Sequence, residues 1–349
     1  MSQRFPSMEV AILGGGNFGT AIANIVASNG HPTHLWMRDV AQVEECRTER
    51  ENRRYLPGHL LVPLVSPTAD LERSVGRSRL VIVSVPSASF REVAAQMAPH
   101  AGPGCTFVSA TKGIERERRD SGATGFKLMS QILEEVTGSH RVGVLSGPNL
   151  AEEIADRQYT GTVIASRDPD VCVLVQTTLK NETLRVYAND DVYGVELGGA
   201  LKNIYAIVCG MAAGMSVGQN TIGMLITRAL AEMSRFAVRL GANPYTFLGL
   251  AGVGDLMVTC TSPLSRNYQL GYRLGQGMSM DEALEDLGKL AEGVNTLRVI
   301  YEVARDLDVY MPLVTGMYRY IFERVDLGEL ISELMTGGNP QDVEFVRPT

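Results

Sequence analysis

The chain has 349 residues, of which 45% are hydrophobic and 20% are charged, and its formal net charge is -7. This length favours two domains, because single hydrophobic cores rarely grow beyond roughly 250–300 residues. The composition excludes a largely disordered chain, and an acidic charge without a basic face argues against a general nucleic-acid binder.

Three sequence features bear on where the protein resides. The longest strongly apolar stretch, 204–215, is too short to cross a bilayer, and the residues before the first glycines lack the pattern of a secretory signal. The five cysteines, at positions 46, 105, 172, 209 and 260, are scattered without a C-x-x-C pair, which is typical of reduced thiols. We therefore expect a cytoplasmic protein without a transmembrane segment.

The first half of the chain alternates strand-like and helix-like segments. Apolar runs predict strands at 8–13, 33–37, 79–85, 105–110, 142–146 and 161–165. Helical spacing of apolar residues predicts helices at 17–28, 88–98 and 127–136. This alternation favours an α/β domain with a doubly wound parallel sheet and helices on both faces.

The pattern changes near residue 192, after which helical spacing dominates. Long apolar helices are predicted at 192–215 and 220–240, and shorter helical segments at 284–287, 296–307 and 312–323. We place the domain boundary within 187–191. The predicted organisation is therefore an α/β domain at 1–189, an all-α domain at 190–336 and a tail at 337–349.

A glycine-rich turn joins the first strand to the first helix. The sequence GGGNFG at 14–19 fits the pattern G-x-G-x-x-G in its expected strand–turn–helix context. Gly14 allows the tight turn, Gly16 lets a pyrophosphate approach the backbone, and Gly19 allows close helix–strand packing. A turn that needs glycine only for its geometry would give the same pattern, but this context favours a dinucleotide site.

The second strand ends at Arg38 and Asp39, about 20 residues beyond the glycines. A carboxylate here commonly binds the ribose 2′-hydroxyl of NAD, and an arginine accommodates the 2′-phosphate of NADP. Asp39 could instead begin the next helix. We therefore expect NAD or NADP as the cofactor, with NADPH slightly favoured by Arg38.

Carbonyl reduction requires a proton donor, and Lys202 is the candidate that the sequence favours. All five histidines lie within the first 140 residues, and no cluster of His, Cys or acidic residues has metal-ligand spacing, so we expect no metal. Lys202 lies in an apolar helix nearly devoid of other cations, where an ammonium loses hydration. A lysine that extends from the helix edge into water is the alternative.

Other polar segments interrupt the apolar patterns. Lys112 follows one predicted strand and the segment 146–149 follows another, and ligands bind at such carboxyl ends in open α/β sheets. In the helical half, Ser265 is a predicted N-cap, which places Arg266 and Asn267 in a first helical turn suited to phosphate. A solvated surface arginine is the simpler alternative for Arg266.

Together these segments resemble the bacterial type of NAD(P)-dependent glycerol-3-phosphate dehydrogenase, from about residue 10 to about residue 331. The motifs that carry the resemblance are GGGNFGTA (14–21), LWMRD (35–39), SATKGIE (109–115), SGPNLAEE (146–153), ELGGALKNIYAI (196–207), GLAGVGDLMVTCTSPLSRN (249–267) and AEGVNT (291–296). The resemblance implies a Rossmann-type domain followed by a helical substrate-binding and catalytic domain. It also implies a homodimer that reduces dihydroxyacetone phosphate reversibly to sn-glycerol 3-phosphate, the backbone of glycerophospholipids.

The same resemblance implies the site residues. Lys202 is then the general acid in reduction and the proton acceptor in oxidation. The implied substrate-binding residues are Lys112, Gly147, Asn149, Lys202, Asp255, Thr259, Ser265, Arg266 and Asn267. The implied cofactor-binding residues are Gly14, Gly16, Asn17, Phe18, Gly19, Arg38, Lys112, Ala151, Arg266, Leu290 and Glu292. The chain departs from the commoner motifs at Gly15, Asn17, Phe18, Asn149 and Leu290, and none of these changes puts the activity in doubt.

Two alternative functions remain open at this point. A related NADP-dependent ketoacid or hydroxyacid dehydrogenase would share the glycine turn, but its substrate would not require the phosphate seat at 265–267. A non-catalytic nucleotide sensor would also keep the turn, but would not need both Lys112 and Lys202. The NAD or NADP preference, feedback regulation and the oligomeric state are also left open.

Overall fold

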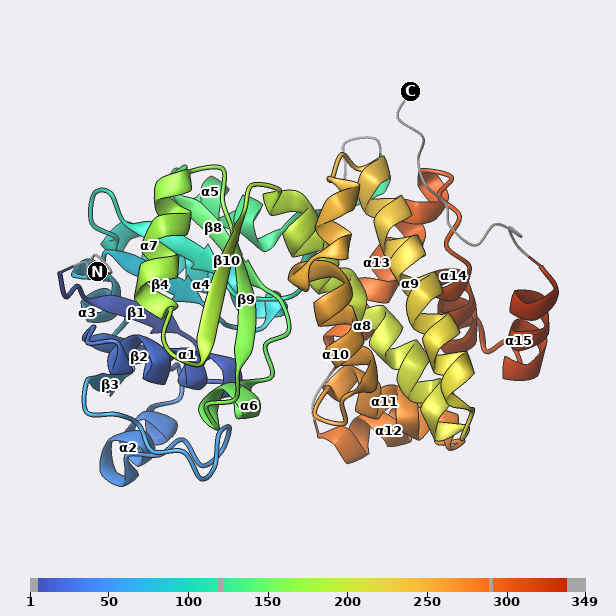
Figure 1. Ribbon diagram of the computed structural model, residues 1–349, viewed down its shortest axis with the longest axis horizontal. Coiled ribbons are helices and arrows are strands. Elements are labelled where there is room, and N and C mark those ends of the chain that lie inside the picture. The colour runs from blue at the N-terminus through green and yellow to red at the C-terminus, as the bar shows by residue number, and fades with distance from the viewer. Residues whose placement is uncertain (1–5, 119–121, 289–290, 338–349) are drawn as a thin grey trace. The chain divides into compact units, whose positions relative to one another are not determined.

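The computed structural model describes residues 6–118, 122–288 and 291–337. The chain divides into two units, shown with their elements in Figure 1. The first unit comprises Met1–Glu115 and Lys127–Glu196, and the second comprises Arg116–Phe126 and Leu197–Thr349. These ranges differ from the predicted domains in two places, because 116–126 group with the helices and the division falls between Glu196 and Leu197. Of the predicted tail, only Gly337 is among the described residues.

In the described residues of the first unit, eight strands form one sheet in the order β10-β9-β8-β5-β4-β1-β2-β3. The strands are β1 (Val10–Leu13), β2 (Thr33–Trp36), β3 (Val65–Thr68), β4 (Leu80–Val83), β5 (Thr106–Ser109), β8 (Val142–Ser146), β9 (Thr160–Ala165) and β10 (Leu184–Asn189). β1 lies between β2 and β4 and is parallel to both, with Val10 opposite Thr33 and Leu80. The carboxyl ends of the parallel strands therefore share one edge, where the glycine turn begins.

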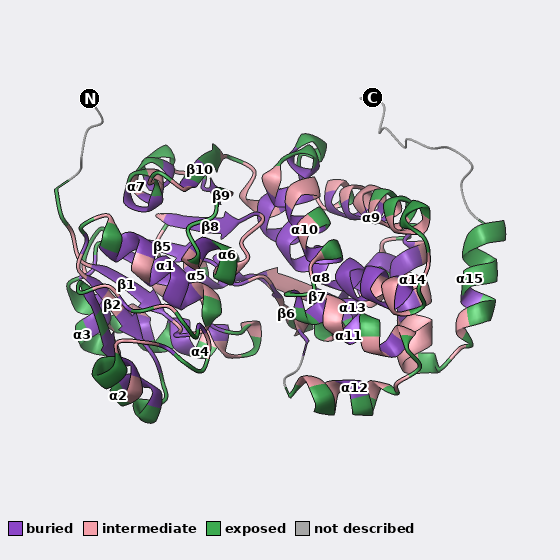
Figure 2. Cartoon of the chain, turned by 60° about the horizontal axis from the view of Figure 1, so that its bottom comes forward, coloured by how far each residue is buried: buried purple, intermediate pink, exposed green. Residues whose placement is uncertain are grey.

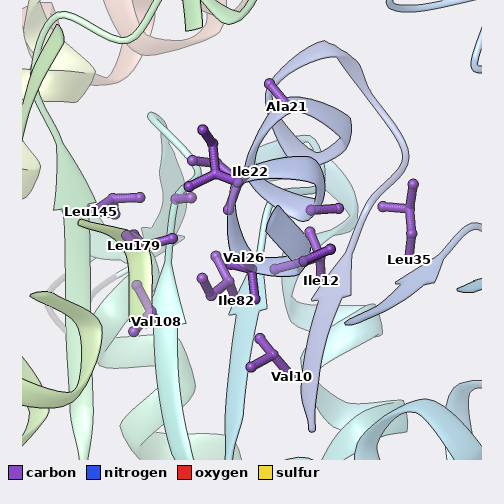
Figure 3. Packing of buried hydrophobic residues seen from close by; sticks show 14 of the residues in the cluster. Val10, Ile12, Ala21, Ile22, Val26, Leu35, Ile82, Val108, Leu145 and Leu179 are labelled. Atoms are coloured by element: carbon purple, nitrogen blue, oxygen red, sulfur yellow. The ribbon is translucent and has the colours of Figure 1, made fainter. Parts of the chain in front are cut away.

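The helices of this unit are α1 (Asn17–Ser28), α2 (Val40–Glu49), α3 (Leu71–Gly76), α4 (Ser87–Met97), α5 (Met129–Thr137), α6 (Ala151–Ala155) and α7 (Pro169–Leu179). Side chains from α1, α2, α6 and α7 join one buried cluster with Val10 and Ile12, and Figure 3 shows part of that cluster. Side chains from α3, α4 and α5 join a second cluster with Ala11 and Leu13. Alternate residues of β1 thus face two different helical layers, so the predicted fold class is confirmed.

The sheet differs from the prediction in one respect, because β9 runs antiparallel to β8 and β10 is parallel to β9. A parallel crossover needs a helix that returns along the strand. α6 has 5 residues, which span about 8 Å at 1.5 Å per residue. It is too short for that return, so the chain turns back and enters β9 in the opposite direction.

The second unit is built mainly from helices. They are α8 (Val192–Gly214), which begins in the first unit, α9 (Gln219–Arg239), α10 (Asp255–Thr261), α11 (Arg266–Gly275), α12 (Met280–Leu287), α13 (Glu292–Asp306), α14 (Pro312–Tyr318) and α15 (Leu327–Thr336). Single helical turns lie at Pro244–Leu248, Leu250–Gly254 and Arg319–Glu323, where the last two have π-type hydrogen bonding. A hairpin of β6 (Ile114–Arg118) and β7 (Thr124–Leu128) reaches this unit, where Arg116 pairs with Glu302 at 2.7 Å.

α8 is the buried central helix of the second unit. Among the described residues it is the one helix long and apolar enough to cross a membrane, but 83% of its apolar window is buried inside the protein. Figure 2 shows this burial along the chain. A core helix gives such a signal without any membrane, because it is apolar on most sides.

α8 and α11 approach each other at the level of the backbone. An added Cβ at Gly271 would overlap the carbonyl oxygen of Ile207, and one at Gly275 would overlap that of Met211. Cβ atoms at Gly210 and Gly214 would likewise overlap carbonyl oxygens of α11. The two helices are therefore packed in parallel through glycines, more closely than larger residues allow.

Candidate active site

The glycine turn of the first unit has the geometry of an anion site. Gly14 has φ +118°, and an added Cβ there would overlap the backbone of Ser84, while one at Gly19 would overlap Gly14. At Gly16, in contrast, an added Cβ would meet no protein atom within 4 Å. Gly16 precedes Asn17 and caps α1, whose first turn carries no acidic residue. The turn thus offers unpaired helix N–H groups beside open space, which fits a cofactor diphosphate.

Asp39 and Arg38 have different environments at the end of β2. Asp39 caps α2 by accepting hydrogen bonds from Ala41 N at 2.9 Å and Gln42 N at 3.3 Å. Its other carboxylate oxygen pairs with Arg54 at 3.1 Å. The interpretation that Asp39 begins the next helix is therefore confirmed. Arg38 is exposed and makes no ion pair with the residues that the structure describes.

Lys112 and Gly147 meet where the adjacent strands β5 and β8 end. The Lys112 ammonium donates a hydrogen bond to the Gly147 carbonyl oxygen at 2.8 Å, and Gly147 has φ +124°. Nearby, both polar atoms of the Asn149 side chain and the hydroxyl of Ser146 are buried without a hydrogen-bond partner in the described part of the chain. Buried polar groups without protein partners are rare and costly, which makes these side chains candidates for contact with a ligand. Ala151 follows as the first residue of α6.

Lys202 in the second unit is buried and held by two residues of α10. Its ammonium donates one hydrogen bond to the Asp255 carboxylate and another to Thr259 Oγ1 at 2.6 Å. The Thr259 hydroxyl in turn donates to the backbone carbonyl of Asp255 at 2.6 Å. The Lys202 side chain is 7% exposed and that of Asp255 is 1% exposed. The ammonium therefore does not extend into bulk water as a surface lysine would.

The predicted phosphate seat lies at the beginning of α11. Ser265 caps this helix by accepting from Tyr268 N at 3.3 Å, as predicted, and the first turn carries no acidic residue. Arg266 and Asn267 occupy that first turn. Asn267 Oδ1 accepts from Gly293 N at 3.0 Å, so the first turns of α11 and α13 lie together. Two helix N-termini thus lie together at this place, although Glu292 adds a carboxylate to the first turn of α13. Arg266 is exposed, as the alternative of a surface arginine also expects.

Of the two predicted cofactor residues near the start of α13, one is described by the structure. Glu292 is the first residue of α13, and Leu290 lies outside the described residues. Among the described residues, no group of three or more His, Cys, Asp or Glu side chains is arranged to hold a metal ion.

Cys260 lies beside Thr259, and its pKa is raised well above the ordinary value, chiefly by burial and then by its neighbour Cys209. It is therefore a protonated packing thiol.

Two family models cover most of the chain. One, described as NAD-dependent glycerol-3-phosphate dehydrogenase N-terminus, matches residues 9–172, and the other, described as the C-terminus of the same enzyme, matches residues 191–332. The chain belongs to the NAD-dependent glycerol-3-phosphate dehydrogenase family. The predicted resemblance is confirmed.

Relatives in this family match over nearly their whole length. A protein of Teredinibacter turnerae named Glycerol-3-phosphate dehydrogenase [NAD(P)+] is 55% identical over 97% of this chain and 98% of its own. One of Azotobacter vinelandii with the same name is 56% identical over 97% of both chains. The crystal structure of glycerol-3-phosphate dehydrogenase from Coxiella burnetii is 33% identical, with a TM-score of 0.87 over 95% of this chain and 99% of that one.

Three residues of this family member are not among the predicted site residues yet have notable surroundings. Gln42 and Asn52 donate hydrogen bonds to the Gly15 carbonyl in the glycine turn. Glu196 is fully buried against Ser130. Their polar side chains carry no recognisable spacing, and each partner lies at least 27 residues away, so only the folded chain brings them together.

Proposed function

We propose that this protein is an oxidoreductase that reduces dihydroxyacetone phosphate to sn-glycerol 3-phosphate with NADPH or NADH, and that it catalyses the reverse reaction. Membership of the family over both halves of the chain supports this function. So do relatives at 55% identity that are named Glycerol-3-phosphate dehydrogenase [NAD(P)+]. The single observation that carries the chemistry is the buried Lys202 ammonium held by Asp255 and Thr259.

Lys202 is the proposed proton donor to the ketone oxygen. An ammonium has three N–H donors. Asp255 and Thr259 accept two of them, which leaves one for the substrate. The nicotinamide, when bound, supplies the hydride. Lys202 protonates the oxygen as its charge develops, and the Asp255 carboxylate balances the cation in this buried place. In the oxidation direction, the neutral amine takes the proton back.

The substrate phosphate is assigned to the first turn of α11. Arg266 supplies a guanidinium that can bind a phosphate through paired hydrogen bonds, and the helix end adds its unpaired N–H groups. Ser265 and Asn267 hold this turn in place through the hydrogen bonds described above. By the family resemblance, Lys112, Gly147 and Asn149 are the other proposed substrate residues.

The cofactor is assigned to the glycine turn of the first unit. Gly14 and Gly19 shape the turn, and the diphosphate binds at Gly16, Asn17 and Phe18. Arg38 is exposed while the neighbouring Asp39 is engaged in a cap and an ion pair, which supports a preference for NADPH. The other proposed cofactor residues are Lys112, Ala151, Arg266, Leu290 and Glu292.

The family resemblance extends the proposal to the cellular setting. We propose a homodimer in the cytoplasm whose product supplies the backbone of glycerophospholipids. The buried cysteines, all free, support a reducing compartment.

The test is oxidation of NADPH by the purified protein with dihydroxyacetone phosphate, with NADH in parallel and an unphosphorylated ketoacid as a second substrate. Lys202→Ala is expected to lower kcat by about 100-fold or more, because a general acid is lost, while the Kd for NADPH stays nearly unchanged. Lys202→Arg is the matched control, because arginine keeps the charge but does not release a proton. It is expected to be as inactive.

Other outcomes would point elsewhere. Near-normal turnover by Lys202→Ala would contradict the assignment of the proton donor. Preferential turnover of the ketoacid would favour the alternative dehydrogenase, and tight NADPH binding without turnover of either substrate would favour a nucleotide sensor.

A further inference from the structure

A cluster of buried polar side chains lies behind the glycine turn of the first unit. This amide cluster consists of Thr20, Gln42 and Asn52. The Gly15 carbonyl oxygen accepts two hydrogen bonds from it, from Gln42 Nε2 at 2.8 Å and from Asn52 Nδ2 at 2.9 Å. Asn52 Nδ2 also donates to Thr20 Oγ1 at 2.8 Å, and Asn52 Oδ1 accepts from Gln42 Nε2 at 3.2 Å.

Holding the Gly15 carbonyl also sets the direction of the next N–H group. In a planar trans peptide, the carbonyl and the following N–H point in opposite directions. The N–H of Gly16 therefore points away from the amide cluster. The space beside Gly16 is open, since an added Cβ there would meet no protein atom within 4 Å. Gly16 caps α1, so its N–H is one of the donors that a helix end leaves without an internal partner.

The turn needs such a restraint because residues 14–16 are all glycine. Glycine has the greatest conformational freedom in the chain, so the Gly15–Gly16 peptide could otherwise rotate. Rotation would remove the acceptor from two buried side-chain amides, which is costly in a dry interior. The amide cluster therefore favours one orientation of this peptide.

Asn52 is itself anchored independently of the turn. The neighbouring Arg50 donates hydrogen bonds to the backbone carbonyls of Leu61 at 3.1 Å and Val62 at 2.6 Å. Glu51 pairs with Leu60 in an antiparallel bridge. These bonds hold the segment before Asn52 to residues 60–62, so the position of Asn52 does not depend on the glycine turn.

We propose that Asn52 and Gln42 are positioning residues for the cofactor, which hold the Gly16 N–H toward the diphosphate of NAD(P)H through the Gly15 carbonyl. This inference rests on the proposed function of the turn in cofactor binding. The two residues act through the backbone and are not in the reacting centre, so they set cofactor affinity and leave the chemical step unchanged.

The test compares three variants of the full chain by calorimetric titration with NADPH and NADH. Asn52→Leu removes one amide donor at similar volume, and its Kd for the cofactor is expected to rise about 10-fold or more. Gln42→Met removes the other donor and is expected to raise the Kd about 3- to 10-fold. The kcat at saturating cofactor and the KM for dihydroxyacetone phosphate should change by less than about 2-fold in both variants. Thr20→Val is the matched control, because Thr20 belongs to the amide cluster but donates nothing to Gly15, and its Kd should stay within about 2-fold.

The outcomes separate this inference from the proposed function. Wild-type Kd values in both Asn52→Leu and Gln42→Met would overturn the inference, as would an equal weakening in Thr20→Val. If circular dichroism shows that Asn52→Leu does not fold, Gln42→Met decides. If the wild-type protein binds neither NADPH nor NADH, the proposed function itself fails.

Discussion

The buried carboxyl group of Glu196 gives a pH-dependent prediction for the stability of the first unit. Glu196 is fully buried and accepts hydrogen bonds from the N–H of Ser130 at 2.9 Å and from the Ser130 hydroxyl. Burial raises the pKa of Glu196 from 4.5 to about 7, against the lowering effect of the Ser130 hydrogen bonds. Because the folded-state pKa lies above the unfolded value, the contribution to the free energy of unfolding is full below about pH 4.5 and is lost as pH rises through about 7.

The size of this loss follows from the shift. At 1.36 kcal/mol per pKa unit, a rise from 4.5 to about 7 corresponds to about 3 kcal/mol at pH 8. Glu196→Gln removes the ionisation and keeps the shape, since its Oε1 can accept from Ser130 N and its Nε2 can donate to the Ser130 hydroxyl. Because part of the contribution is already lost at pH 5, the stability of the variant relative to the wild-type protein should rise by about 2.5 kcal/mol between pH 5 and pH 8.

The chain carries a convenient reporter for this measurement. Its single tryptophan, Trp36, lies in β2 of the same unit, so urea unfolding followed by Trp36 fluorescence reports on this unit. Glu72→Gln, at an exposed position in α3, is the control and should change the free energy of unfolding by less than about 1 kcal/mol at either pH. A difference between Glu196→Gln and wild type that stays constant from pH 5 to pH 8 would refute the reasoning.

Three further substitutions test other parts of the structure. Arg266→Ala should raise the KM for dihydroxyacetone phosphate by about 10- to 100-fold, because a charge-assisted phosphate contact is lost, and an unchanged KM would place the phosphate seat elsewhere. Arg38→Ala should lower kcat/KM with NADPH by about 10-fold more than with NADH, and equal losses would show that the 2′-phosphate is not bound there. Gly271→Ala should destabilise the second unit by about 1–3 kcal/mol in thermal unfolding, because its Cβ would overlap the Ile207 carbonyl oxygen. The control is Gly223→Ala in α9, where an added Cβ meets nothing within 4 Å. This control should raise the free energy of unfolding by up to about 1 kcal/mol. Equal effects of the two substitutions would contradict the close contact between α8 and α11.

The elements predicted best are those whose signals are local. α1 has the predicted bounds, because the glycine turn marks its beginning and apolar spacing marks its length. β3 escaped prediction because its four residues, VSPT, include a serine and a proline that weaken the strand pattern. β10 was also not predicted, although its residues alternate between buried and exposed from Leu184. Its last residues fall within 187–191, which we interpreted as the domain boundary. The direction of β9 depends on the short α6 and not on its own residues.

The candidate site shows the same division between local and distant information. The cap at Ser265 is a local pattern and was predictable. Lys202 could be selected from its apolar helix, but its partners Asp255 and Thr259 lie 53 and 57 residues away, and periodicity cannot pair positions so far apart. The family motifs selected those partners. Neither source selected Asn52, because its role depends on a contact with Gly15 across 37 residues.

The glycine contact between α8 and α11 has a consequence for substrate choice. Lys202 and Arg266 lie on these two parallel helices, each about one and a half turns before the paired backbones of Ile207 and Gly271. The two backbones are in contact here, so the distance between the Lys202 backbone and the start of α11 does not depend on side chains packed between the helices. With the roles proposed for these two cations, we expect this fixed backbone spacing to favour a ketone a set number of bonds from its phosphate over longer homologues.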